Sequence, residues 1–302
     1  MSSVADGDVY TLLNDYSGSS LSMGSLMSNR TFTLDLNSKT LTLSGNTKSG
    51  ALAFNSSSSA KNNTVTIKNG TLTVTGGLSA LNIKNNNKMI LNNDLTINTS
   101  VGAVLLEGSA KLDSAATINN TKGAAIQTNG STTNADSQIN ITGGSITSSD
   151  IGIYLPAGKL NITGGTILAG TGVYIKTGVT NITAGSITGN GTKADYVYNS
   201  NGANSTGNAI VVDNCGYPGG EAQVTISGGS FESINNAAVG SYGHETYAAL
   251  EGFIPSDSTA RFKGAIETSN DTVEEGYELV LDKDGFYIVQ EKEYVASIGT
   301  KK

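Results

Sequence analysis

Short alternations of apolar and polar residues recur along the chain roughly every 21 residues. In each piece the apolar residues occupy every second position, which is the period of a β-strand. One series runs from LTL at Leu41–Leu43 to VTI at Val224–Ile226, and a second includes GIYLPAG at Gly152–Gly158 and GVYIKTG at Gly172–Gly178. The pattern predicts many short strands of two or three kinds, separated by turns.

Two neighbouring segments align without a gap over their whole length. Ile151–Gly170 matches Thr171–Asn190, with Tyr154 opposite Tyr174 and Asn161 opposite Asn181. We expect such segments to stack in register, so that inward residues meet inward residues and outward residues form ladders. The expected inward set is Ile153, Leu155, Ile162, Ile167, Val173, Ile175, Ile182 and Ile187. The expected outward ladders are Tyr154/Tyr174, Asn140/Asn161/Asn181 and Thr142/Thr163/Thr183.

The fold class predicted from this periodicity is all-β: a right-handed parallel β-helix solenoid with a short N-terminal capping helix and a C-terminal hairpin cap. A leucine-rich repeat is excluded because its L-x-x-L-x-L-x-x-N framework is missing, whereas a β-sandwich stays as the alternative. The predicted divisions are residues 1–29 as N-terminal cap, 30–235 as coils and 236–302 as C-terminal cap. Short helices are expected at Asp8–Tyr16 and His244–Leu250, and a hairpin at Glu278–Gln290.

Several pieces resemble a known superfold. FTLDLNSKTLTLSG (Phe32–Gly45) and VTIKNGTLTV (Val65–Val74) look like coils of the pectate-lyase-like parallel β-helix. ISGGSF (Ile226–Phe231) and GYELVLDKDGFYIV (Gly276–Val289) are similar to closing segments of repetitive cell-surface proteins of gut Gram-positive bacteria. The resemblance implies a β-helix and a bacterial surface setting. It says little about activity, because that superfold carries lyases, hydrolases and adhesins alike.

Composition narrows the function classes. Only 14% of residues are charged and 38 are Gly, which disfavours coiled coils and helical bundles. The net charge of −7 disfavours nucleic acid as a partner. A helix that spans a membrane needs roughly 18 consecutive apolar residues, and the sequence contains no such stretch, so membrane insertion is not expected. Met1–Tyr10 does not look like a signal peptide. The resemblance to surface proteins, the polar outer ladders and the acidic balance of charge nevertheless lead us to expect a secreted or surface-displayed bacterial protein whose signal was removed, with a phage fibre or spike as the other setting.

No cofactor, metal site or catalytic set is predicted. Cys215 is the one cysteine and His244 the one histidine, so neither has a partner of its own type for a disulfide or a zinc site. Glycoside hydrolases need two carboxylates about 5–9.5 Å apart. The acidic residues within the repeating part do not fall in register on adjacent coils; they are Asp94, Glu107, Asp113, Asp150 and Asp213. A polysaccharide lyase or hydrolase stays as the alternative function.

Three insertions interrupt the regular spacing, and loops of this kind often carry function. They are Asn129–Gln138, Gly189–Gly207 and Asp213–Gln223. Tyrosine faces beside carboxylates and amides suit sugar rings, although the tyrosines can also simply cover the edge of the core. The sequence therefore predicts a non-catalytic adhesin or glycan-binding module, with a polysaccharide or host-surface glycan as partner and a structural stalk as a further alternative. The predicted ligand-binding residues are Asp195, Tyr196, Tyr198, Asp213, Tyr217 and Glu221.

Overall fold

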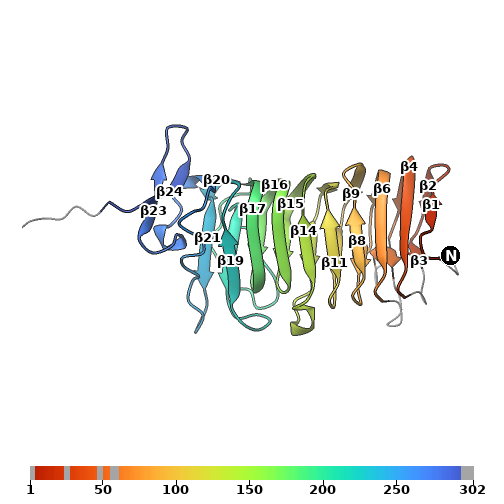
Figure 1. Cartoon of the computed structure of the whole chain (residues 1–302), viewed down its shortest axis with the longest axis horizontal. Helices are drawn as coiled ribbons and strands as arrows, with labels where there is room; N and C mark the ends of the chain where they lie inside the picture. The colour runs from red at the N-terminus through yellow and green to blue at the C-terminus, as the bar shows by residue number, and fades with distance from the viewer. Residues whose placement is uncertain (1–3, 24–27, 46–49, 55–60, 294–302) are drawn as a thin grey trace, which may run out of the picture.

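The protein is an elongated tube of parallel strands (Figure 1). The computed structural model describes residues 4–23, 28–45, 50–54 and 61–293. Within these ranges it holds 24 β-strands and two 3₁₀ helices, and no α-helix. The tips of both predicted caps, residues 1–3 and 294–302, lie outside the described residues.

The strands form three walls around a central core, and the chain visits the walls in turn. The first wall contains β1 (Val9–Thr11), β8 (Lys88–Leu91), β11 (Lys111–Ser114), β14 (Gln138–Ile141) and β19 (Ala222–Ile226). The second contains β2 (Tyr16–Gly18), β9 (Leu95–Thr99), β12 (Thr117–Asn120), β20 (Ser230–Ala237) and β22 (Arg261–Ile266). The third contains β3 (Leu21–Met23), β5 (Gly50–Phe54), β7 (Ser79–Ile83), β10 (Gly102–Leu106), β13 (Ile126–Thr128), β18 (Ile210–Asn214) and β21 (Val239–Gly243).

Five longer strands turn a corner and contribute to more than one wall. They are β4 (Thr31–Leu43), β6 (Thr64–Val74), β15 (Ser145–Leu155), β16 (Lys159–Ile175) and β17 (Gly178–Gly189). The remaining elements are η1 (Thr132–Asn134), η2 (Asn270–Thr272) and the antiparallel pair β23 (Tyr277–Leu281) and β24 (Tyr287–Glu291).

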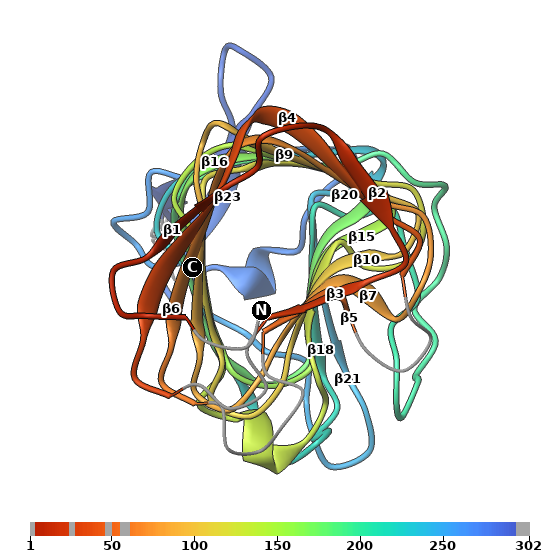
Figure 2. The ribbon, with the colours of Figure 1, turned by 90° about the vertical axis from the view of Figure 1, so that its right-hand side faces the viewer.

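Each strand of the tube pairs in parallel with the strand of the same wall in the adjacent turn of chain. Ile153 lies opposite Val173 and Val173 opposite Ile210 in the third wall, and Asn161 lies opposite Asn181 in the first. The hydrogen bonds between strands therefore run along the long axis. Viewed down that axis, the walls close into a ring around the core (Figure 2).

The structure corrects the predicted fold class and the resemblance that went with it. All described strands belong to one sheet, which closes into a barrel-like parallel ring and has antiparallel pairs only at its C-terminal end, between β22 and β24 and between β23 and β24. The predicted right-handed β-helix solenoid with an N-terminal capping helix is wrong as stated. Asp8–Tyr16 contains β1 and the first residue of β2, which pair with β4, and no helix. His244–Leu250 is also not a helix; His244 forms an isolated antiparallel bridge with Tyr247.

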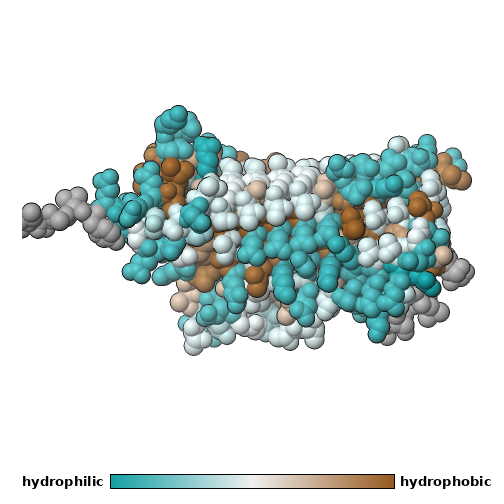
Figure 3. Space-filling view, in the orientation of Figure 1, coloured by the Kyte–Doolittle hydropathy of each residue, from teal (hydrophilic) through white to brown (hydrophobic). Residues whose placement is uncertain are grey.

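The core is a single column of side chains enclosed by the three walls. The predicted inward set is buried throughout, with Ile153, Leu155, Val173, Ile175 and Ile182 fully inaccessible. These residues alternate with outward residues along each strand, so each turn contributes the same positions to the core. On the outer face seen in Figure 3, hydrophilic residues form a band across the middle and also lie at both ends, beside a broad area of intermediate hydropathy and small, scattered hydrophobic patches.

An amide ladder on the first wall confirms the predicted outward register. The side-chain amide of Asn181 donates to Asn161 Oδ1 over 3.3 Å, and that of Asn161 donates to Asn140 Oδ1 over 2.8 Å. The amide of Asn140 in turn donates to Asp113 Oδ1 over 2.7 Å. Beyond the ladder, β16 turns from the first wall to the second at Gly165, which has a φ of +85°. A Cβ at Gly165 would lie 2.6 Å from the Gly143 carbonyl oxygen. Only glycine fits such a corner.

Candidate functional site

A long loop covers the outer face of the third wall near its C-terminal end. It comprises residues 190–209, here called the covering loop, and connects β17 to β18. Beneath it Tyr174 is fully buried in a small cluster with Ile151 and Val211. The predicted outward pair of Tyr154 and Tyr174 is confirmed, since the two residues are partners in adjacent strands and their ring centres lie 6.0 Å apart. Tyr174 is nevertheless buried, because the covering loop shields this stretch of the outer face.

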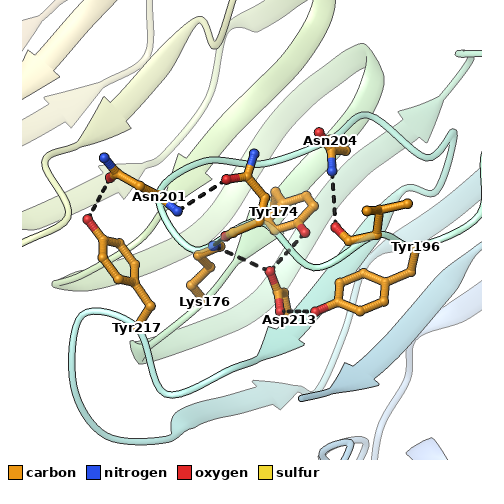
Figure 4. Close-up of polar contacts among 9 residues, drawn as sticks. Tyr174, Lys176, Tyr196, Asn201, Asn204, Asp213 and Tyr217 are labelled. Atoms are coloured by element: carbon orange, nitrogen blue, oxygen red, sulfur yellow. Dashed lines mark hydrogen bonds and ion pairs between the residues drawn. The ribbon is translucent and has the colours of Figure 1, made fainter. Parts of the chain in front are cut away.

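Asp213 lies at the centre of the polar contacts beneath this loop (Figure 4). It ends the outward row of β18 and has no exposed surface. The Tyr174 hydroxyl donates to Asp213 Oδ2 over 2.9 Å, and the Tyr196 hydroxyl donates to Oδ1 over 2.8 Å. Both carboxylate oxygens are thus occupied by phenols, one from the wall and one from the loop.

Lys176 supplies the positive charge that compensates Asp213. Its ammonium lies 3.6 Å from Asp213 Oδ2, and both side chains are fully buried. The ammonium also donates to the backbone carbonyl of Asn199 in the covering loop and lies 5.2 Å from the centre of the Tyr217 ring. A buried charge needs a partner and further hydrogen bonds to be tolerated, and here the covering loop provides part of them.

Tyr217 connects the covering loop with two of the predicted insertions. It belongs to the insertion Asp213–Gln223, and its hydroxyl donates to the side chain of Asn201 over 2.7 Å. The same hydroxyl lies 2.9 Å from the backbone carbonyl oxygen of Gly130, in the insertion Asn129–Gln138. The three insertions, distant in sequence, therefore meet at this tyrosine.

Two stacked pairs of aromatic rings join the covering loop to the end of β21. The rings of Tyr196 and Tyr242 stack with centres 4.4 Å apart, and those of Tyr198 and His244 with centres 3.4 Å apart. Tyr242 and His244 lie at and just beyond the end of β21. Tyr198 is 38% exposed and its neighbour Val197 61% exposed. We call Val197, Tyr198 and His244, with the Tyr196–Tyr242 stack beneath, the tyrosine platform.

The structure divides the six predicted binding residues among three places. Tyr196 and Tyr198 belong to the tyrosine platform, and Asp195 is exposed beside them. Asp213 and the Tyr217 hydroxyl are engaged in contacts within the protein. Glu221 is exposed at the far side of its insertion, and its backbone carbonyl accepts a hydrogen bond from Thr177 over 3.3 Å. The six side chains therefore do not converge on one ligand.

The cluster also contains three residues that were not predicted as ligand-binding, namely Tyr174, Lys176 and Tyr242. Lys176 follows Tyr174 by two residues, so both side chains point outward from the same strand. The continuous apolar run Ala209–Val212 indicated that β18 is covered on both faces, and all five residues of β18 are buried. The apolar run and the insertion that precedes it together indicate in the sequence that a loop covers the outer face of β18.

Burial and the negative charge of Asp213 raise the pKa of both phenols. For Tyr174 the main cause is burial, followed by the charge of Asp213 and the hydrogen bond to it. For Tyr196 burial is again the largest cause, followed by the hydrogen bond to Asp213. Each hydroxyl therefore stays protonated in the folded protein at pH values where a free tyrosine ionises.

Alkaline conditions are expected to destabilise the fold through these tyrosines. A pKa raised in the folded state means that the unfolded chain loses the proton first, so the stabilisation is complete below about pH 10 and falls as the pH rises above it. Phenolate absorbance at 295 nm measured with far-UV circular dichroism is expected to show a tyrosine fraction that ionises only as the strands unfold. Complete ionisation of every tyrosine before any loss of strand signal would contradict this.

The described residues offer no paired carboxylates across adjacent strands and no metal centre. In the strand pairings, Asp113 faces Asn140, Asp213 faces Tyr242 and Glu232 faces Lys263, and no acidic residue faces another. Within the described ranges no three His, Cys, Asp or Glu side chains are grouped to hold a metal ion.

Helices capable of spanning a bilayer are missing from the part of the chain that the structure describes.

Comparison with known proteins gives no relative for this chain. No protein-family model, no curated protein and no solved structure matches it. The expected likeness to the pectate-lyase-like superfold and to gut bacterial surface proteins is thus without a matching protein.

Proposed function

We propose that the protein is a non-catalytic glycan-binding module whose contact surface is the tyrosine platform. The observation that carries this proposal is the Tyr198–His244 stack, in which two flat rings lie 3.4 Å apart at the surface with Tyr198 38% exposed. Sugar rings present apolar faces that pack on aromatic side chains, and hydroxyls that reach nearby polar groups. Asp195 and the backbone of the covering loop supply such groups.

The platform rests on a rigid base, which favours binding. Tyr196 is fixed from below by Tyr242 and by its hydrogen bond to Asp213, and the side chain of Asn204 donates to the Val197 carbonyl over 3.0 Å. A surface held in this way loses little conformational entropy when a ligand binds. Asp213 is a support in this proposal and not a ligand contact, because it has no exposed surface.

The rival function, polysaccharide cleavage, lacks a matching arrangement among the described residues. A hydrolase needs two carboxylates that both reach the sugar. In the covering-loop region Asp213 is enclosed by tyrosines and Lys176, so its carboxylate does not reach a bound sugar. A secreted or surface-displayed location is part of the proposal, since extracellular glycans are the expected ligands.

Tyr198→Ala is expected to weaken glycan binding about two- to tenfold, the range given by loss of one exposed aromatic stack. The measurement is retention on an array of plant and host glycans, followed by titration of the best ligand. Tyr16→Ala serves as the matched control, because Tyr16 is 47% exposed at the opposite end of the tube and is expected to leave binding unchanged.

The same incubations also test the rival functions. Release of new reducing ends or unsaturated products from any glycan would overturn the non-catalytic proposal. Absence of both binding and products across the array would favour a structural stalk or fibre. Equal losses in Tyr198→Ala and Tyr16→Ala would show that the contact surface is not the platform.

A further inference from the structure

A groove separates two of the insertions on the corner between the third and first walls. One side is the insertion Asn129–Gln138, which contains η1 and stands out from the wall in Figure 2. The other side is the insertion Asp213–Gln223. Between them lie two short corners, at Ala157–Lys159 and Thr177–Val179, that carry no insertion. The groove has a volume of about 330 Å³, and we call it the corner groove.

Its two sides are fixed to each other at one place. The Tyr217 hydroxyl approaches the Gly130 carbonyl oxygen, which joins the insertions. The floor is rigid because the two corners pack closely: Gly178 has a φ of +86°, and a Cβ there would lie only 2.0 Å from the Gly158 carbonyl oxygen. The groove is therefore formed by the fold itself and does not require a ligand to assemble it. Its volume is at the lower end of ordinary ligand sites, about 300–1,000 Å³.

Three outward residues lie in register along the floor. Lys159 pairs with Val179, and Val179 pairs with Gln223, so an apolar side chain sits between an ammonium and an amide. Adjacent strands are about 4.8 Å apart, which places the two polar groups about 10 Å from each other. Glu221 and Pro218 form one side and Thr132 the other. An apolar centre flanked by hydrogen-bonding groups matches the face and the rim hydroxyls of a sugar ring.

The charges around the groove select against acidic ligands. Lys159 lies 3.6 Å from Asp136 in an exposed pair, so the formal charges of these two residues sum to zero. Glu221 is exposed, and no ion pair to it is found among the described residues. The groove therefore carries a net negative charge from Glu221, which repels a sugar carboxylate but accepts hydrogen bonds from hydroxyl or amino groups.

We infer that the corner groove is a second carbohydrate site, separate from the tyrosine platform, that takes one or two units of a neutral or amino sugar. The inference rests on the proposed glycan-binding function and adds a ligand class to it. The ring packs on Val179 and Pro218, Lys159 and Gln223 donate to its hydroxyls, and Glu221 accepts from them. Residues 215–217 connect β18, which supports the platform, to the side of the groove formed by Pro218 and Glu221. One glycan chain or two separate chains can therefore engage the platform and the groove.

Amide chemical-shift titration of the full chain tests the groove directly. The probes are cellobiose and N,N′-diacetylchitobiose as neutral sugars, and digalacturonic acid as the acidic comparison. At least one neutral disaccharide is expected to shift the amides of Thr177–Val179 and Gly219–Gln223, and to bind at least fivefold more tightly than the acidic one. Lys159→Gln and Glu221→Gln are each expected to weaken that binding at least fivefold, and Val179→Trp to abolish it by filling the floor.

Lys111→Gln is the matched control, because Lys111 lies on the same outward row two turns away through Gln138 and lines no part of the groove. It is expected to bind the probes as the unmodified protein does. Tyr198→Ala is expected to leave the groove shifts intact, which separates this inference from the proposed platform. Three results would overturn the inference: no shifts in the groove with either neutral sugar, tighter binding of digalacturonic acid, or unchanged binding in Val179→Trp. If Tyr198→Ala loses binding on the glycan array while no sugar shifts the amides of the groove, the platform proposal stands and only the second site is refuted.

Discussion

Asp213→Ala is expected to lower the free energy of unfolding by about 3–5 kcal/mol. The substitution leaves the Lys176 ammonium buried without its counter-charge, and the hydroxyls of Tyr174 and Tyr196 without their acceptor. An unpaired buried charge is among the largest single-residue penalties in folded proteins. Chemical denaturation followed by circular dichroism measures the change, and the covering loop is expected to become sensitive to proteolysis at the same time.

The Lys84–Glu107 pair provides a control of the same kind in a solvated setting. Glu107 and Lys84 follow the paired residues Leu106 and Ile83, as Asp213 and Lys176 follow Val212 and Ile175. Their ions lie 2.7 Å apart, but the side chains stay 25% and 39% exposed. Glu107 also accepts hydrogen bonds from the side chains of Asn82 and Asn129. Glu107→Ala is therefore expected to cost about 1–2 kcal/mol, less than Asp213→Ala because no buried charge is left unpaired. Equal losses in the two variants would mean that burial of the Asp213 pair does not determine its energetic role.

Phe231→Ala is the second substitution expected to have a large effect, a loss of about 3–5 kcal/mol. Phe231 is fully buried, and its ring stacks on Phe262 of the next turn with centres 5.2 Å apart. Removing it leaves a cavity in the last turns of the core, next to the C-terminal hairpin. Thermal and chemical unfolding both report the loss.

Ile234→Ala, on the same strand β20, is the appropriate comparison. Ile234 is 56% exposed and points away from the core, so its truncation is expected to stay within about 0.5 kcal/mol of the unmodified protein. A small effect of Phe231→Ala would show that the core rearranges to fill the space. A large effect of Ile234→Ala would show that this outer face is covered in solution.

Strand positions and register could be predicted from the sequence because most strands of the first and second walls alternate and neighbouring turns resemble one another. The ungapped alignment placed Tyr154 opposite Tyr174 and Asn161 opposite Asn181, and the observed pairings agree. The hairpin expected at Glu278–Gln290 is present as β23 and β24. In these segments local pattern and tertiary pairing favour the same conformation.

The N-terminal helix was predicted wrongly because spacing alone does not decide between helix and strand in a short segment. Val9, Leu12, Leu13 and Tyr16 have helical spacing, yet a helix of about nine residues is marginal without packing. Pairing of β1 and β2 with β4 offers backbone hydrogen bonds to an existing sheet instead. Val9 and Leu13 remain 60% and 75% exposed, so no buried apolar stripe was available to hold a helix.

The candidate site was predicted only in part, because loop conformation depends on contacts far away in sequence. The insertions were visible as interruptions of the spacing, and Tyr196 and Tyr198 lie at the surface formed by one of them. The burial of Asp213 could not be inferred in the same way. The burial of Asp213 depends on the position of the covering loop over the wall. Contacts of that loop with Lys176 and Tyr217 fix this position, and Tyr217 in turn contacts the Gly130 carbonyl of another insertion.

The covering loop also has a consequence for how new surfaces arise on this fold. Partners in the third wall are 20 residues apart in the step before the loop, from Ile153 to Val173, whereas the loop extends the next step to 37 residues, from Val173 to Ile210. The entropy of closing a chain segment grows only with the logarithm of its length, so nearly doubling this step costs about 0.6 kcal/mol. The register of the strands on either side is kept. Long insertions at the corners are thus thermodynamically minor events, and the tube can evolve a new outer surface at one turn while the walls that support it stay the same.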